Sequence, residues 1–205
     1  MNKRTLNQEE ISQEYGIIAR SIAPIGLMMA VFNTAYSLWF GFAWGIAGWI
    51  IFALTAICNI YILCSSLSNI RHARQFEAHE TEDSRRIGRQ MGILSGISYS
   101  SIWILAIILP FFHGEKYIFP MLTMIIGLHF IPQAKIMNRK IDYLTAPFPI
   151  VSAGIAFYLA FSTETDWLSL AALAAVGGAI ATLIYGFYML DAYQKAAAQY
   201  QVPYP

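Results

Sequence analysis

Apolar residues in this chain come in six long blocks that are separated by short polar segments. Each block is about 20 residues long, the length that an α-helix needs to cross roughly 30 Å of hydrocarbon. The pattern therefore predicts an all-α integral membrane protein with six transmembrane helices. The predicted spans cover about residues 16–40, 44–66, 88–112, 117–137, 145–162 and 167–190.

The basic residues predict how these spans are oriented. Of the 13 Lys and Arg residues, only Lys116 falls in a loop after the first, third or fifth span. Because cytoplasmic loops carry the excess of Lys and Arg, both termini are predicted to be cytoplasmic. The spans then form three hairpins of a multi-pass protein of the cell (inner or plasma) membrane. Residues 67–87, which are rich in charge, are expected to form a cytoplasmic helical extension or loop.

Composition agrees with a membrane protein, since 57% of the residues are hydrophobic, 12% are charged and the mean hydropathy is +0.51. The lipid bilayer is therefore a predicted partner. The net charge is +1 and the basic residues are spread over several loops, which argues against a nucleic-acid partner. Cys58 and Cys64 are six residues apart on one span and form no metal-binding spacing. Neither a metal nor a cofactor is predicted.

All Asp and Glu residues lie in the tails, in the loops or at span edges. Proton- and sodium-coupled carriers often place carboxylates in the middle of the membrane. Intramembrane aspartyl proteases and two-metal carboxylate enzymes also need acidic residues there. The distribution of carboxylates therefore argues against all three classes.

Five spans carry a neutral polar residue or an imidazole at one level. At 1.5 Å per residue, these residues lie roughly 17 to 22 Å from the outer ends of their spans. They are Asn59, Ser100, His129, Ser152 and Thr182. One interpretation is a central binding site, with His129 as its titratable member. The other is hydrogen bonding between helices, a common use of such side chains in membranes.

The segment GLHFIPQAKIMNRK (residues 127–140) adds two features to His129. Gln133 follows one helical turn later and shares its face, so the two residues form a candidate polar wall. Pro132 removes a backbone hydrogen bond and is predicted to bend or end the helix. We regard His129 and Gln133, with Asn59 and Ser100 opposite, as the candidate binding residues. Ser152 and Thr182, which lie at the same level, complete the candidate set.

Small residues recur every four positions on two spans, which favours close packing of helices. One stripe contains Gly88, Gly92, Gly96 and Ser100, and the other contains Ala174, Gly178, Thr182 and Gly186. The stripes either join the third span to the sixth within one chain, which we favour, or form the face of a homodimer or of a contact with a membrane partner.

Three functions fit these patterns. The first is a small permease or channel-like protein for a small neutral or anionic solute, with its site around His129. The second is a non-catalytic partner or assembly subunit of a membrane complex. The third is a membrane enzyme that acts on a lipid or isoprenoid, with His129 as base and Lys135, Arg139 and Lys140 binding an anionic head group. No nucleophile, base and acid form a recognisable constellation, so a non-enzymatic function is favoured.

Overall fold

The computed structural model describes residues 8–79 and 81–204. Within these residues the protein is helical and contains no strand. The elements are α1 (Gln8–Ala73), α2 (Glu82–Phe111), the 3₁₀ helix η1 (Glu115–Tyr117), α3 (Ile118–Met137), α4 (Lys140–Thr145), α5 (Pro147–Ser162) and α6 (Trp167–Gln199). In the described chain, five helical segments are long and apolar enough to cross a membrane. The all-helical, membrane-compatible architecture predicted from the sequence is thus confirmed.

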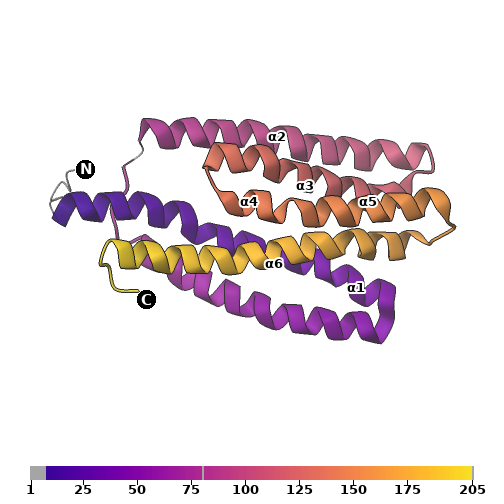
Figure 1. The fold of residues 1–205 in the computed structure, drawn as a ribbon, viewed down its shortest axis with the longest axis horizontal. Coiled ribbons are helices and arrows are strands. Elements are labelled where there is room, and N and C mark those ends of the chain that lie inside the picture. The colour runs from indigo at the N-terminus through magenta and orange to yellow at the C-terminus, as the bar shows by residue number, and fades with distance from the viewer. Residues whose placement is uncertain (1–7, 80, 205) are drawn as a thin grey trace.

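The helix α1 turns back on itself at Gly45 (Figure 1). Gly45 has φ 56° and ψ −134°, a backbone conformation that residues with a Cβ rarely adopt. The first limb of α1 (residues 8–44) and the second limb (residues 46–73) are antiparallel, and Asn33 of the first bonds to Asn59 of the second. The limbs approach closely near the turn, because a Cβ at Gly48 would lie 1.8 Å from the carbonyl oxygen of Phe40.

The helix α6 is the central helix of the bundle and lies against both limbs of α1 and against α3, α4 and α5. Its glycines allow this closeness. A Cβ at Gly177 would lie 2.1 Å from the carbonyl oxygen of Phe148, and one at Gly178 would lie 2.5 Å from the ring of Tyr36. A Cβ at Gly186 would lie 2.9 Å from Ile62. The stripe of Ala174, Gly178, Thr182 and Gly186 is therefore buried within one chain, mostly against α1.

The helix α2 lies at the edge of the bundle (Figure 1). In the described part of the chain its backbone lies beside α3 and η1, but beside neither α1 nor α6. Ser98 is the one buried residue of α2. A Cβ at Gly88, Gly92 or Gly96 would meet no atom within 4 Å. The favoured prediction, that this stripe packs on the sixth span, is therefore wrong, because α2 contacts the bundle through a different face.

Pro132 does not end the helix, which was one of the two outcomes predicted for it. The helix α3 continues through Pro132 to Met137, as helices in membranes can when neighbouring groups satisfy the freed carbonyl. Asn138 ends the helix in the left-handed conformation, with φ 51° and ψ 45°. The following segment forms α4, which buries Ile141, Asp142 and Thr145 against the bundle. A segment predicted to connect two spans thus becomes part of the core.

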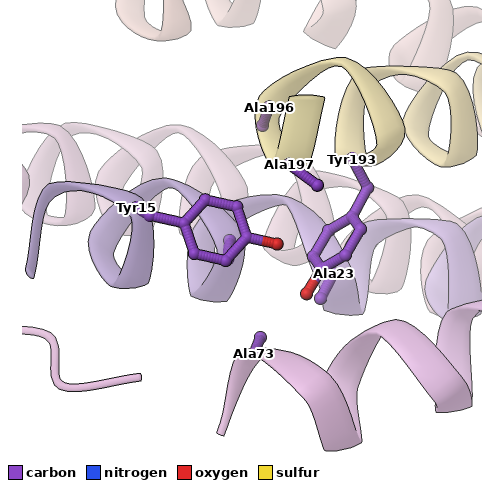
Figure 2. Close-up of a cluster of buried hydrophobic side chains, with 7 residues drawn as sticks. Tyr15, Ala23, Ala73, Tyr193, Ala196 and Ala197 are labelled. Atoms are coloured by element: carbon purple, nitrogen blue, oxygen red, sulfur yellow. The ribbon is translucent and has the colours of Figure 1, made fainter. Parts of the chain in front are cut away.

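At the end of the bundle that holds both termini, an aromatic cluster joins the first limb of α1, the second limb and α6 (Figure 2). Tyr15 and Tyr193 are fully buried there among alanines. The hydroxyl of Tyr193 lies 2.8 Å from Nδ1 of His72. Arg20 donates to the carbonyl oxygen of Ala73, at the end of α1, and to that of Phe76, three residues further on. These contacts hold the two limbs of α1 and α6 together at this end of the bundle.

Candidate functional site

A cavity of about 390 Å³ lies between the first limb of α1, α2, α3 and α6. Most of its wall is apolar and aromatic. The aromatic side chains are Phe32, Tyr36, Trp39, Tyr99, Trp103, Phe119 and Phe130. The polar side chains are Ser95, His129, Gln133 and Thr182. A mostly apolar wall with few polar groups is typical of small-molecule binding sites.

The cavity exists because α2 stands away from α1. Since the backbones of these helices are not neighbours, the space between them is bordered only by side chains. Several lining side chains are also open to the outside: Met28 is 49% exposed, Tyr99 41% and Trp103 69%. The cavity therefore opens sideways between α1 and α2, on the lateral face of the helix bundle.

The cavity is elongated along the helices. It extends from Met28 to Trp39 on α1 and from Met91 to Trp103 on α2. At 1.5 Å per residue, these stretches correspond to about 17 and 18 Å. Gln133 lies at the end of the cavity nearer the chain termini, and Phe119 lies at the opposite end. The cavity thus has a polar end and an aromatic end.

His129 reaches the cavity from α3 and is half-buried. Its Nδ1 lies 2.9 Å from the hydroxyl oxygen of Ser98 on α2. This bond orients the imidazole and leaves Nε2 as its second polar atom. Ser100, the residue predicted to lie opposite His129, is exposed on another face of α2. The structure thus pairs His129 with Ser98.

Gln133 connects the polar end of the cavity to a buried carboxylate. Its Nε2 donates to Oδ1 of Asp142 over 2.6 Å and lies 3.4 Å from the hydroxyl of Tyr185. Asp142 is fully buried, and its Oδ2 has no hydrogen-bond partner in the described structure. Asp142 was not predicted as a site residue, because it follows the basic residues that mark the end of the fourth span. The signal that could have found it is the spacing of Ile141, Asp142 and Thr145 on one helical face.

Asn59 and Thr182 belong to a separate hydrogen-bond network between helices. Nδ2 of Asn33 donates to Oγ1 of Thr182 over 3.1 Å and to the carbonyl oxygen of Ala179. Nδ2 of Asn59 donates to Oδ1 of Asn33 over 3.0 Å and to Oγ1 of Thr34 over 3.1 Å. These bonds join both limbs of α1 to α6. Thr182 also reaches the cavity wall, whereas Asn59 does not line it.

Ser152 likewise connects two helices outside the cavity. It is buried on α5, and its hydroxyl donates to the carbonyl oxygen of Ala174 on α6 over 2.9 Å. Of the predicted binding residues, the structure therefore brings His129, Gln133 and Thr182 to one cavity. It places Asn59 and Ser152 in helix contacts and Ser100 on the exposed face of α2.

The cavity wall contains no Lys, Arg, Asp or Glu side chain among the described residues. In the same part of the chain, no group of three or more His, Cys, Asp or Glu side chains is placed to hold a metal ion. The chemistry available to the polar side chains of the wall is thus hydrogen bonding by Ser95, His129, Gln133 and Thr182. These groups can recognise a hydroxyl or a carbonyl oxygen.

Comparison of the chain with protein-family models, with curated proteins and with solved structures finds no match.

Proposed function

We propose that the protein crosses the cell membrane six times, with both termini on the cytoplasmic side. The crossings are the two limbs of α1, then α2, α3, α4 with α5, and α6. Two observations support this topology. The start of α1 and the end of α6 lie at the same end of the bundle (Figure 1), and 10 of the 11 Lys and Arg residues in the described chain belong to the segments at that end. Among the described residues, Lys116 is the one basic residue at the opposite end.

In this membrane, we propose that the protein binds a neutral amphipathic molecule that enters from the bilayer. The observation that carries this proposal is the cavity between α1 and α2, which opens sideways and has a polar end at His129 and Gln133. An apolar chain would lie along the aromatic wall, and a hydroxyl or carbonyl group would bond to the polar end. Of the permease function predicted from the sequence, the cavity supports the step in which a solute is bound.

The charges around the cavity favour a neutral head group over an anionic one. No basic side chain lines the wall in the described structure, and the carboxyl group of Asp142 lies directly behind Gln133. In a region of low dielectric, an anion without a cationic partner carries a large desolvation cost. Of the neutral and anionic solutes predicted from the sequence, the cavity wall therefore favours a neutral one.

A photoreactive ligand tests this proposal. The protein is reconstituted in lipid nanodiscs with a long-chain alcohol that carries a diazirine in its chain, and the labelled peptides are mapped by mass spectrometry. We expect labels on the cavity-lining parts of α1, α2 and α3. Ala35 lines the cavity, so Ala35→Trp fills it and should reduce this labelling several-fold. Ala53→Trp is the matched control, since Ala53 is exposed on the second limb of α1, away from the cavity.

Labelling that is spread evenly over all lipid-facing helices would contradict the proposal. The proposal would also be contradicted if Ala35→Trp and Ala53→Trp changed the labelling of the cavity peptides equally. The alcohol would then contact the protein only as part of the surrounding lipid and not as a ligand in the cavity. Both variants place a Trp on a helix that faces lipid, so their folding in the membrane should be comparable.

A second candidate function is that of an assembly subunit, and the exposed face of α2 favours it. Gly88, Gly92 and Gly96 leave open space on that face, which would let another membrane helix approach closely. Cross-linking of Cys residues introduced at Gly92 in nanodiscs tests this candidate. A species that contains a single chain under all conditions would count against it.

A further inference from the structure

The carboxyl group of Asp142 is the one acidic group that the fold buries completely among the described residues. Its Oδ1 accepts the hydrogen bond from Gln133, and its Oδ2 has no partner in the described structure. In that same part of the chain, no basic side chain forms an ion pair with it within 4.0 Å. In the described structure the carboxylate thus has no cation in direct contact with it.

Few charged or titratable groups face Asp142 from the surrounding helices. From α6 it meets the hydroxyl of Tyr185, and from α3 it meets the uncharged Gln133. Arg139, which directly precedes α4, acts on Asp142 only through its charge. The neighbouring α5 contributes Tyr158 as its titratable residue, and that side chain is exposed. A negative charge on Asp142 would therefore be stabilised chiefly by neutral hydrogen bonds.

An isolated carboxylate that is buried in this way is costly, and such groups take up a proton instead. We propose that Asp142 is a proton-binding residue whose protonation selects the head group that the cavity accepts. This coupling rests on the proposed function, because it acts on the ligand of the same cavity. The proton site itself stands on the burial and the missing partner of Asp142 alone.

Gln133 is the residue that transmits the protonation state to the cavity. An ionised Asp142 can only accept hydrogen bonds, so the amide of Gln133 must turn its NH₂ group toward Asp142 and its carbonyl oxygen toward the cavity. A protonated Asp142 can donate to that carbonyl oxygen, which frees the NH₂ group for the ligand. Protonation thus changes Gln133 from an acceptor into a donor at the cavity, with rotation of the amide as the only movement.

This change distinguishes two kinds of head group. A hydroxyl both donates and accepts, so it can bond to either orientation of Gln133. A ketone only accepts, so it needs the NH₂ group and hence a protonated Asp142. We therefore expect a long-chain ketone, but not the matching alcohol, to bind only while Asp142 is protonated.

Two measurements test the proposal. The first is infrared spectroscopy of the ligand-free protein in nanodiscs, in which a protonated carboxylic acid has a distinct carbonyl stretch. We expect such a band at neutral pH, its loss in Asp142→Asn and its retention in Asp191→Asn. Asp191 is the matched control, because it is exposed and pairs with Lys195 over 2.6 Å. We also expect Gln133→Met to shift the band, which tests the assignment in a variant that keeps Asp142.

The second measurement compares photolabelling by a long-chain diazirine ketone and by the alcohol across pH. We expect ketone labelling to fall several-fold relative to alcohol labelling as Asp142 ionises, and the ratio to become independent of pH in Asp142→Asn. An infrared band that is absent at neutral pH, or unchanged in Asp142→Asn and Gln133→Met, overturns the proton site. A ratio that is constant in the native protein overturns the coupling. Failure of both probes to label the cavity overturns the proposed function, while the infrared band still decides the proton site.

Discussion

The hydroxyl of Ser98 lies 2.9 Å from Nδ1 of His129, and this bond joins α2 to α3 at the wall of the cavity. Ser98 is the one residue of α2 that is buried. The helix that forms one side of the opening is thus attached to the bundle near the imidazole. The position of α2 and the orientation of His129 therefore depend on the same contact.

Replacing Ser98 by Ala should weaken that attachment. Loss of one partly buried hydrogen bond lowers the free energy of unfolding by about 1 kcal/mol, and His129 would lose the group that orients it. We expect Ser98→Ala to reduce stability against denaturing detergent and to reduce labelling of the cavity by the alcohol probe. Ser100→Ala is the control, since Ser100 is exposed on the same helix. Equal stability and equal labelling of the two variants would show that the bond to His129 contributes neither to stability nor to ligand binding.

Asn59→Ala should lower the free energy of unfolding and leave ligand binding intact. Asn59 bonds to Asn33 and Thr34 across the two limbs of α1, and it does not line the cavity. Interhelical hydrogen bonds of this kind contribute about 1 kcal/mol each in membranes. We expect the free energy of unfolding, measured in a detergent titration, to fall by about 1 kcal/mol, while photolabelling of the cavity stays normal. Thr55→Ala is the control, because the Thr55 hydroxyl bonds only within its own helix, to Phe52.

If Asn59→Ala abolished labelling while stability was unchanged, Asn59 would belong to the binding site, as the sequence suggested. The sequence supports both interpretations because it fixes how deep a residue lies in a span but not which way it points. Ser98 and Ser100 show the same limit. They are two residues apart and so differ by about 200° around the helix axis, which separates a buried position from an exposed one.

The helical segments and the turns between them could be predicted from hydropathy. His129 and Gln133 could be predicted as site residues because they are polar residues deep within a membrane span. Asp142 could not be predicted in this way, because hydropathy assigns a carboxylate beside Arg139 and Lys140 to a loop. Its burial depends on where Asn138 turns the chain and on how α4 then packs against α3 and α6. The lateral opening could not be predicted either, since it depends on the distance between α2 and the first limb of α1, which the second limb separates in sequence.

The N-terminus of α6 should make stability depend on pH. Asp166 caps this helix, and its carboxylate accepts hydrogen bonds from the backbone N–H groups of Leu168 and Ser169. Bonds from Ser169, and then from the backbone of Leu168, hold the pKa of Asp166 below its usual value. Because the folded state has the lower pKa, the cap stabilises the protein above the unfolded pKa of about 4, and this stabilisation is lost as pH falls through the folded value.

We therefore expect the difference in melting temperature between the native protein and Asp166→Asn to shrink as the pH is lowered below about 4. Asn can cap a helix but cannot ionise, so it retains the geometry without the titration. Glu164→Gln is the control, since Glu164 is exposed and makes no hydrogen bond in the described structure. A difference that is constant with pH would exclude ionised Asp166 as the source.

Two Gly→Ala substitutions should have opposite effects because their surroundings differ. A Cβ at Gly177 would lie 2.1 Å from the carbonyl oxygen of Phe148, so Gly177→Ala forces α6 away from α5. Overpacking of this kind costs about 1–3 kcal/mol. A Cβ at Gly92 meets nothing within 4 Å, so Gly92→Ala should stabilise α2 by up to about 1 kcal/mol through its higher helix propensity. Detergent unfolding titrations measure both. A loss of stability in Gly92→Ala would instead indicate that another helix covers this face of α2 in the membrane, which would favour the assembly-subunit function.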